Sequence, residues 1–431
     1  MERQFREVHI QVNEELILQT IRQLAKVYRG AAEANALIDR ARRAKFVLLG
    51  EASHGTSEFY ADRAALSKRL ITEHGYRFIA VEGDWPSCFA LNRYVKGCSD
   101  SGSDVRQALQ DFSRWPSWMW ANREIADLAE WLRRYNADKP DEEKVGFYGM
   151  DIYSLWESMD EILKYLGSRE GSDLEAAKRA FECFEPNGGD EQSYGVSAAL
   201  YGEGCEDEAV ELLRKLQDKW KEAKPGEREH ALSAEMNAMA VQGGEAYYRT
   251  MIRHDAESWN VRDRHMVQAI EKLAEFHGPR ARAVIWAHNT HIGDARYTDM
   301  AADGMINLGQ LLREKYGEDV YAIGYGTYQG AVIAGRSWGA PSQEMNVPKA
   351  IAGSWEELLH RSGTENKLLL FEEEHPALDD AIIGNRAIGV VYHPERERGN
   401  YVPTAISKRY DAFIYMDETK ALSPLSPMVV R

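Results

Sequence analysis

Cysteine is scarce in this sequence, whose 431 residues include only Cys88, Cys98, Cys183 and Cys205. These residues form no CxxC pair and lack the spacing of a metal finger, so we expect reduced thiols rather than disulfides. Long apolar runs are also missing, which argues against a membrane span. The first 13 residues alternate charge and hydrophobicity and contain no apolar signal core. The sequence therefore predicts a cytoplasmic protein without a membrane partner.

Positive charge is in deficit, because 53 Lys and Arg residues face 69 Asp and Glu residues, a formal net charge of -16 at pH 7. A nucleic-acid partner needs clustered Lys and Arg, so the composition argues against that class. Excess negative charge is typical of solubility, and a cationic substrate is the less favoured alternative. The sequence also contains no P-loop and no GxGxxG after a strand, so nucleotide chemistry has no support.

The most informative segment is GEASHGTSEFYADR at 50–63. It follows an apolar run at 45–49 that predicts a buried strand, and it leads into a helix expected to end near residue 74. Glu51 and His54 then lie on the turn at the carboxyl end of the strand, where open α/β sheets bind ligands. A carboxylate beside a histidine orients the ring and favours the imidazolium, as a general base requires.

Polar side chains also follow three other predicted strands. These strands are expected at 76–81, 144–150 and 282–286, and they precede Glu82, Asp151, and the pair His288 and His291. Further strands are expected at 319–324, 386–392 and 411–416. Because the carboxyl ends of parallel strands meet at one edge of a sheet, the sequence predicts a single polar site there.

Residues 154–276 are charged and helical in character, with almost no strand signals. The sequence therefore predicts an α/β fold, in which a mostly parallel sheet core flanked by helices carries an inserted all-helical domain. We expect the first part of the core at 1–153, the helical insert at 154–280, and the second part, with the C-terminal strands, at 281–431. A further helix is expected at 14–36. The tryptophans within 114–136 favour packing between domains over a wall for a bulky apolar ligand.

One chemistry that fits these residues is metal-free ester hydrolysis. His54 would deprotonate a water that attacks the carbonyl carbon, Glu51 would orient the imidazole, and Arg63, Arg262 or His288 would stabilise the oxyanion. Both arginines fall on apolar stripes of predicted helices. A buried arginine needs a carboxylate partner, whereas one at the edge of the stripe can reach solvent, and for Arg63 the two alternatives are evenly balanced.

The second chemistry uses a divalent metal. Glu51, His54, Glu82 and His288 offer oxygen and nitrogen donors that suit zinc, manganese or iron, although no HExxH motif is present. A serine nucleophile is disfavoured, because the nearest approach to a GxSxG elbow has Glu51 in place of its first glycine.

Seven segments, in the expected order, resemble the erythromycin esterase family. They are LGEASHGTSEF at 49–59, AVEGD at 80–84, GMDIYS at 149–154, WNVRD at 259–263, WAHNTH at 286–291, IGVVYHPE at 388–395 and YDAFIYMDET at 410–419. The resemblance implies an α/β core with a helical insert and ester hydrolysis by a histidine-activated water without a required metal. In characterised members this reaction opens the macrolactone ring of macrolides, and other relatives carry a label of succinoglycan biosynthesis.

Carried over by position, His54 matches the family's general base and Glu51 its paired acidic residue. The remaining candidates are Arg63, Glu82 and His288 as active-site residues, with His291, Arg262 and Asp151 as substrate-binding residues. We therefore expect a cofactor-free esterase acting on a small-molecule ester. The alternatives are a metallohydrolase and a non-catalytic protein that binds a metal, haem or small ligand. The sequence leaves the oligomeric state open.

Overall fold

The structure is a computed structural model that describes residues 14–167, 171–187, 189–252, 255–371 and 373–425, so the N-terminal pattern at 1–13 lies outside the described residues. Its centre is a nine-stranded sheet in the order β1-β8-β11-β6-β2-β5-β3-β4, with β7 pairing beside β6. The strands are β1 Lys26–Val27, β2 Phe46–Leu49, β3 Phe78–Asp84, β4 Gly146–Asp151, β5 Ala283–Trp286, β6 Val320–Gly335, β7 Ser342–Val347, β8 Lys367–Leu370 and β11 Ala412–Thr419. The expected α/β class is confirmed.

Six neighbouring strands of this sheet, from β11 to β4, run parallel, whereas β1, β7 and β8 pair antiparallel. Both faces of the sheet are buried, as successive side chains of β2 illustrate. Val47 and Leu49 belong to the core on one face, and Phe46 and Leu48 belong to the core on the other. A strand covered on both faces reads as a continuous apolar run, which is why the sequence predicted the central strands correctly.

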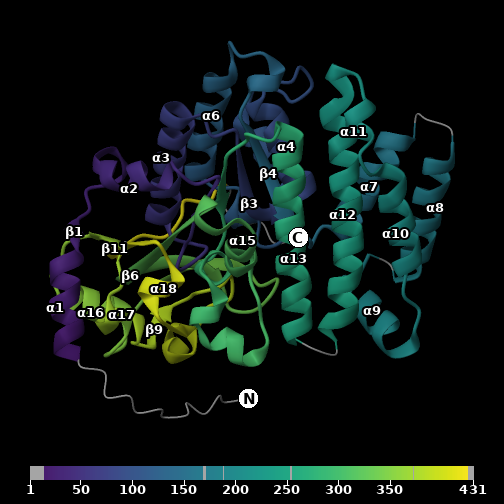
Figure 1. Cartoon of the computed structure of the whole chain (residues 1–431). Helices are drawn as coiled ribbons and strands as arrows, with labels where there is room; N and C mark the ends of the chain where they lie inside the picture. Colours follow the sequence, from purple (N-terminus) through teal and green to yellow (C-terminus); the bar gives the residue numbers. More distant parts are fainter. Residues whose placement is uncertain (1–13, 168–170, 188, 253–254, 372, 426–431) are drawn as a thin grey trace.

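Helices cover the two faces and form one large lateral layer (Figure 1). Those before and after the insert are α1 Glu14–Leu24, α2 Asn35–Ala41, α3 Ser57–His74, α4 Trp85–Val95, α5 Val105–Leu109, α6 Arg123–Asn136, α14 Asn289–Ile292, α15 Leu308–Tyr316, α16 Trp355–Arg361, α17 Pro376–Asp379 and α18 Ile406–Arg409. Those of the expected insert are α7 Leu155–Leu166, α8 Ser172–Phe184, α9 Glu191–Val196, α10 Glu206–Leu216, α11 Lys219–Glu222, α12 Arg228–Met251 and α13 Asp255–His277.

The described residues between Leu155 and His277 contain no strand, as the sequence predicted. Helices α7 to α10 and one side of α12 share a hydrophobic core of their own. The other side of α12, with Met236 and Met239, joins the core against the sheet together with Ile270 of α13. Helix α12 therefore belongs to both layers and connects the insert firmly to the α/β core.

Two predicted elements are wrong. The helix expected at 14–36 ends at Leu24, because the next residues form β1, which pairs with β8. The strand expected at 386–392 is instead β9 Ile383–Arg386, which pairs with β10 Tyr401–Thr404 in a separate two-stranded sheet. Tertiary pairing partners, which local apolar pattern does not reveal, decide both differences.

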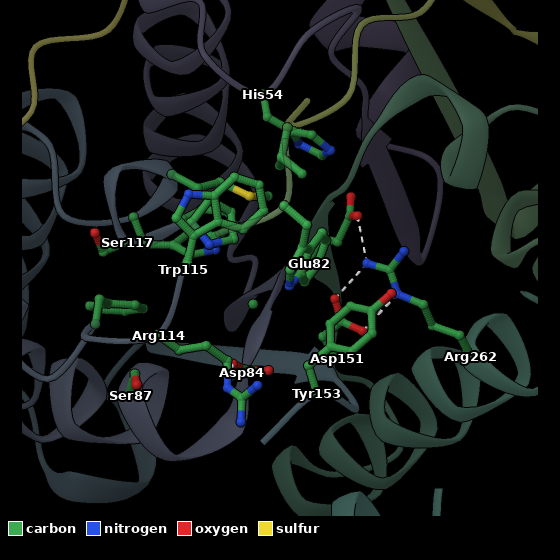
Figure 2. Close-up of a pocket in the computed structure, with 17 residues that line it drawn as sticks. His54, Glu82, Asp84, Ser87, Arg114, Trp115, Ser117, Asp151, Tyr153 and Arg262 are labelled. Atoms are coloured by element: carbon green, nitrogen blue, oxygen red, sulfur yellow. Dashed lines mark hydrogen bonds and ion pairs between the residues drawn. The ribbon is translucent and has the colours of Figure 1, made fainter. Parts of the chain in front are cut away.

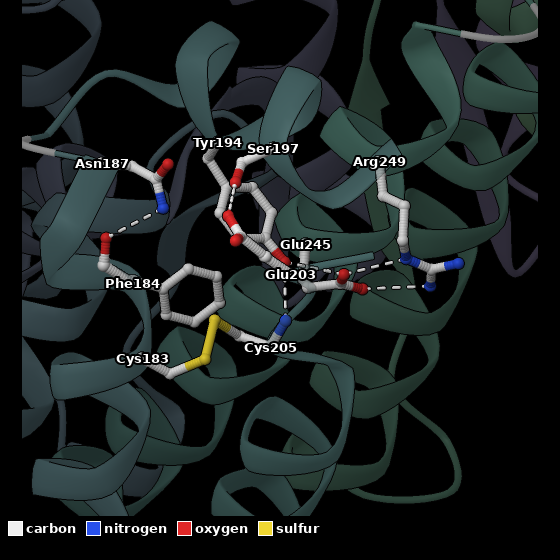
Figure 3. The surroundings of a disulfide bond; sticks show 9 residues. All are labelled: Cys183, Phe184, Asn187, Tyr194, Ser197, Glu203, Cys205, Glu245 and Arg249. Atoms are coloured by element: carbon white, nitrogen blue, oxygen red, sulfur yellow. Dashed lines mark hydrogen bonds and ion pairs between the residues drawn. A yellow bond between two sulfur atoms is a disulfide. The ribbon is translucent and has the colours of Figure 1, made fainter. Parts of the chain in front are cut away.

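The expectation of four reduced cysteines is also wrong. Cys183, near the end of α8, forms a disulfide with Cys205, just before α10, and only Cys88 and Cys98 are free (Figure 3). The pair is 22 residues apart in sequence and meets because α8 and α10 pack together, a contact that cysteine spacing does not reveal. The argument from reduced thiols for a cytoplasmic location is thereby removed.

Among the described residues, no helix is both long enough and apolar enough to cross a membrane.

Candidate active site

The predicted site residues meet where four parallel strands end. Strands β2, β5, β3 and β4 are consecutive neighbours in the sheet, so their carboxyl ends lie side by side. Strand β3 continues three residues further than expected, to Asp84, so Glu82 lies inside it. Backbone bonds hold the turns together, since the Asn289 N–H donates to the Glu51 carbonyl at 2.9 Å.

A chain of three side chains leads from the core to His54. The Nδ1 of His54 lies 2.8 Å from Oε1 of Glu51, and Nη2 of Arg63 donates to Oε2 of the same carboxylate at 2.6 Å. Glu51 is fully buried, and His54 is 7% exposed. Because the carboxylate accepts the Nδ1 proton, Nε2 is the nitrogen left to contact a water or a substrate.

Arg63 is fully buried and does not reach solvent, so the interpretation of an arginine at the stripe's edge is wrong. Its guanidinium lies over the rings of Tyr60 and Trp286, with 4.3 and 4.7 Å to the ring centroids. Glu51 neutralises its charge, and the two rings replace part of its hydration by cation–π contact. Arg63 therefore positions Glu51 and does not line the cleft.

Arg262, on α13, joins the ends of β3 and β4. It donates two hydrogen bonds to the carboxylate of Asp151, from Nε at 2.8 Å and from Nη2 at 2.6 Å. Its Nη2 also donates to Glu82 at 2.8 Å. The two strands and the helical insert are thus connected through one guanidinium. With its charge shared between two carboxylates, Arg262 holds the polar wall of the site in place.

His291 lies behind this wall between two carboxylates. Its Nδ1 is 3.0 Å from both oxygens of Asp263, its Nε2 is 3.4 Å from Glu82, and its ring stacks on Trp259 at 4.4 Å. Burial alone would lower the pKa of His291, but Asp263 and Glu82 outweigh burial and raise that pKa to about 9. Asp263 is not among the residues predicted for the site, although it follows Arg262 directly within WNVRD.

Glu82 is ionised despite its burial. Burial acts to raise its pKa, but the charges of His291, His54 and Arg262 hold the pKa of Glu82 well below its usual range. Its second oxygen accepts the backbone N–H of His288 at 2.8 Å. Glu82 therefore fixes the turn that carries His288 as well as the guanidinium of Arg262.

His288 is a neutral imidazole next to His54, with 4.9 Å between the ring centroids. Burial, and next the charge of His54, hold the pKa of His288 well below its usual range. The Thr290 N–H donates to Nδ1 of His288, so Nδ1 is an acceptor and the ring proton is on Nε2. That Nε2 is buried and has no hydrogen-bond partner in the structure. The Ala52 carbonyl interacts with this imidazole and acts to raise the pKa of His288, so the N–H beside the ring of His54 is at most weakly bonded.

The side chains offered for a metal do not fit one. Within the described residues, no group of three or more His, Cys, Asp or Glu side chains is arranged to hold a metal ion. Both oxygens of Glu51 already accept hydrogen bonds, and both oxygens of Glu82 do the same. The carboxylate oxygens that a metal would need are thus engaged with protein groups.

A cleft of about 750 Å³, counting space that opens to solvent, begins at His54 and runs between the sheet edge and surrounding loops (Figure 2). Its polar lining consists of His54, Glu82, Asp84, Ser87, Arg114, Ser117, Asp151 and Arg262. Its apolar lining consists of Phe112, Trp115, Pro116, Met119, Trp120, Tyr153, Trp338 and Val390. Four of the predicted site residues lie behind these lining side chains and do not line the cleft themselves: Glu51, Arg63, His288 and His291.

Two features of the cleft were missed. Trp115 and Trp120 line it, the role that the sequence disfavoured, and Trp120 is at the same time buried in the core together with Trp118. Asp84 also lines it, and burial raises the pKa of Asp84 to about 7 against the opposing effect of Arg114. Asp84 follows Glu82 by two residues within AVEGD, on the same strand and hence on the same side of it, and this spacing could have predicted that Asp84 belongs to the site.

Comparison with known proteins gives consistent matches at low identity. YbfO of Bacillus subtilis (strain 168), which carries a provisional hydrolase name, is 22% identical over 307 residues, or 67% of this chain and just under two thirds (66%) of that protein. Erythromycin esterase type II of Escherichia coli is 22% identical over 368 residues, covering 76% of this chain and 80% of the relative.

Solved structures share the fold over nearly the whole chain. A crystal structure of a succinoglycan biosynthesis protein has a TM-score of 0.76 at 20% identity, covering 95% of this chain and 98% of that one. An erythromycin esterase mutant, EreC, in its open conformation has a TM-score of 0.65 at 18% identity, covering 90% and 94%. The family model described as Erythromycin esterase matches residues 71–419, and on this match the chain belongs to the erythromycin esterase family.

Proposed function

We propose that this protein hydrolyses a carboxylic ester by attack of a water that His54 activates, without a metal. The observation that carries the proposal is the buried chain from Arg63 through Glu51 to His54, which ends at the cleft. The chain holds the imidazole in one orientation and one tautomer, with Nε2 free to accept a proton. Family membership supports hydrolase chemistry, and the names of two relatives support an ester as the substrate.

In this mechanism Nε2 of His54 takes a proton from water as the oxygen attacks the carbonyl carbon. The carboxylate of Glu51 stabilises the imidazolium that forms, and Arg63 keeps Glu51 in place. The imidazolium then donates the proton to the departing alkoxide, so that the acid and the alcohol leave and His54 returns to its neutral form.

The developing oxyanion needs a hydrogen-bond donor close to His54, and His288, which lies just behind the lining of the cleft with its ring 4.9 Å from that of His54, is the nearest candidate. A neutral donor suits the task because it does not repel the imidazolium of His54. Arg63 is fully buried behind Glu51, and Arg262 is already committed to Asp151 and Glu82. Of the three oxyanion partners expected from the sequence, we therefore propose His288.

The substrate is proposed as an ester of a bulky alcohol, with macrolactones included because the relative from Escherichia coli is named an erythromycin esterase. The test is mass-detected hydrolysis of macrolides and simple esters, with and without a chelator. We expect turnover that survives chelation and falls at least ~100-fold in His54→Ala, the loss typical of a missing general base. A variant of His360, a histidine of α16 outside the cleft, serves as control and should keep full activity.

The other results would contradict this mechanism. Turnover lost on chelation would favour the metallohydrolase, and full activity of His54→Ala would exclude His54 as the base. Stabilisation by a small ligand without any product would favour a binding protein.

A further inference from the structure

The outer half of the cleft carries an exposed tryptophan at the tip of a hairpin. Trp338 lies between β6 and β7, in the segment 336–340, and is 59% exposed to solvent. It is nevertheless held in place, because its ring centroid lies 4.8 Å from that of Trp115 and 6.3 Å from that of Tyr153. A large indole that stays exposed at the mouth of a cavity is a typical ligand contact.

The hairpin contacts Trp115 through its backbone at Gly335 and Ala340 as well as through Trp338 at its tip. The indole N–H of Trp115 donates to the Ala340 carbonyl at 2.9 Å. A Cβ on Gly335 would come within 2.9 Å of the Trp115 ring, so the β6 backbone packs directly against the indole. These contacts fix the position of Trp338 before a ligand binds. A surface that is already ordered loses little conformational entropy on binding.

The ring-lined wall continues towards the reacting end of the cleft. One face of Tyr153 is covered by the guanidinium of Arg262, 4.8 Å from the ring centroid, and Arg262 in turn bonds Glu82. Phe112, Met119 and Trp120 line the cleft together with these rings. His54 lines the same cavity as these rings. A ligand that binds among the rings would therefore place its polar groups near His54.

We propose that Trp338 and Trp115 form a binding subsite for an apolar ring or macrocycle face carried by the substrate ester. The subsite lies within a cleft rather than on an open face, so its occupant is part of a small molecule and not a folded partner. Its rings offer flat apolar surfaces of the kind that stack on other rings. This subsite rests on the proposed esterase function and narrows its substrate class to esters with a large ring system.

The test separates binding from hydrolysis by using a ketone that cannot be hydrolysed. Binding of methyl 2-naphthyl ketone is measured by isothermal titration calorimetry to wild type, Trp338→Ala and Trp338→Phe. Loss of one stacking surface should weaken binding about 10-fold in the alanine variant, and phenylalanine should restore most of it. The matched control is Tyr201→Ala, which removes a 74% exposed aromatic from the helical insert and should leave binding unchanged.

Kinetics on two esters then connects the subsite to catalysis. In Trp338→Ala, kcat/KM for 2-naphthyl acetate should fall about as much as ketone binding does, mainly through KM, while kcat/KM for ethyl acetate stays within about twofold. Unchanged ketone binding, or an equal loss on both esters, would overturn the subsite. Ketone binding that depends on Trp338 without hydrolysis of either ester would support the subsite and contradict the esterase function.

Discussion

Asp84 is a carboxyl group of the cleft whose ionisation is opposed by its surroundings. Its Oδ1 is buried without a hydrogen-bond partner, and its Oδ2 lies 3.5 Å from Nε of Arg114. Arg114 also pairs with Glu157 and Glu191, so its charge is divided among three carboxylates. Burial comes first among the causes that raise the pKa of Asp84 from 3.8 to about 7, and the charges of Asp151 and Glu157 add to it.

This raised pKa gives a stability difference that depends on pH. Between about pH 4 and pH 7 the unfolded chain loses the Asp84 proton while the folded chain keeps it, so the contribution of Asp84 to stability falls as pH rises. Asp84→Asn removes this contribution. We therefore expect the unfolding free energy of the variant, relative to wild type, to increase from pH 4 to pH 7 and then level off.

Urea titrations of both proteins across this pH range measure the difference. Asp207→Asn, at an exposed position of α10, is the matched control and should show no such trend. A flat difference between Asp84→Asn and wild type would show that Asp84 titrates as an ordinary exposed carboxyl.

At the scale of elements, the turn between β2 and α3 packs tightly against β6. The Gly55 carbonyl accepts hydrogen bonds from the backbone of Ile333 at 3.0 Å and of Leu422 at 2.9 Å. A Cβ on Gly55 would lie 2.0 Å from the Ile333 carbonyl oxygen, a backbone atom that cannot rotate away. The turn that carries His54 therefore keeps its position only while residue 55 is glycine.

We expect Gly55→Ala to push the turn away from β6, which costs about 1–3 kcal/mol of unfolding free energy as an overpacked core does. Because His54 adjoins the clash, ester hydrolysis should fall more than ~10-fold in protein that is still folded, since small misplacements of a catalytic group cost large factors. Gly389→Ala is the control, because a Cβ there would meet no atom within 4 Å. Full activity of Gly55→Ala would contradict this prediction, because it would show that β6 shifts to accommodate the added methyl group.

At the scale of the whole molecule, the helical insert is stabilised separately from the sheet by its own core and by the Cys183–Cys205 disulfide. Near this bond, Glu245 of α12 accepts hydrogen bonds from Tyr194 and Arg249 (Figure 3). The bond closes a loop of 22 residues within the insert. None of these residues lines the cleft, so their contribution is to the stability of the insert.

Replacing both cysteines with serine should lower the unfolding free energy by ~2–4 kcal/mol, as loss of a disulfide typically does. Activity should change little, because the cleft residues keep their partners. Thermal unfolding with and without a reductant provides the measurement: wild type should lose stability on reduction, and the double variant should not. Cys98→Ser, which alters a free cysteine, should behave as wild type does. Equal stability of wild type in both conditions would contradict a stabilising disulfide.

The sequence by itself determined the parallel strands and the polar residues that follow them. Strands β2, β3, β4 and β5 are buried on both faces, so each reads as an apolar run, and the chain leaves each of them through residues such as Glu51, Asp151 and His288. Parallel strands bring these exits to one edge, so the pattern predicted that these residues lie close together, although it did not point to Asp84 or Asp263. The helical insert was equally visible, because its periodicity is local.

Only the tertiary structure decided which group pairs with which. Arg63 binds Glu51, and Arg262 binds Glu82 and Asp151, because long side chains from separate elements choose partners by distance, which sequence spacing does not encode. The same holds for the Cys183–Cys205 bond. It holds also for the cleft, whose ring-lined wall joins Trp115 to Trp338 across more than 200 residues of sequence. Local pattern specifies elements, whereas packing between distant elements specifies the chemistry of the site.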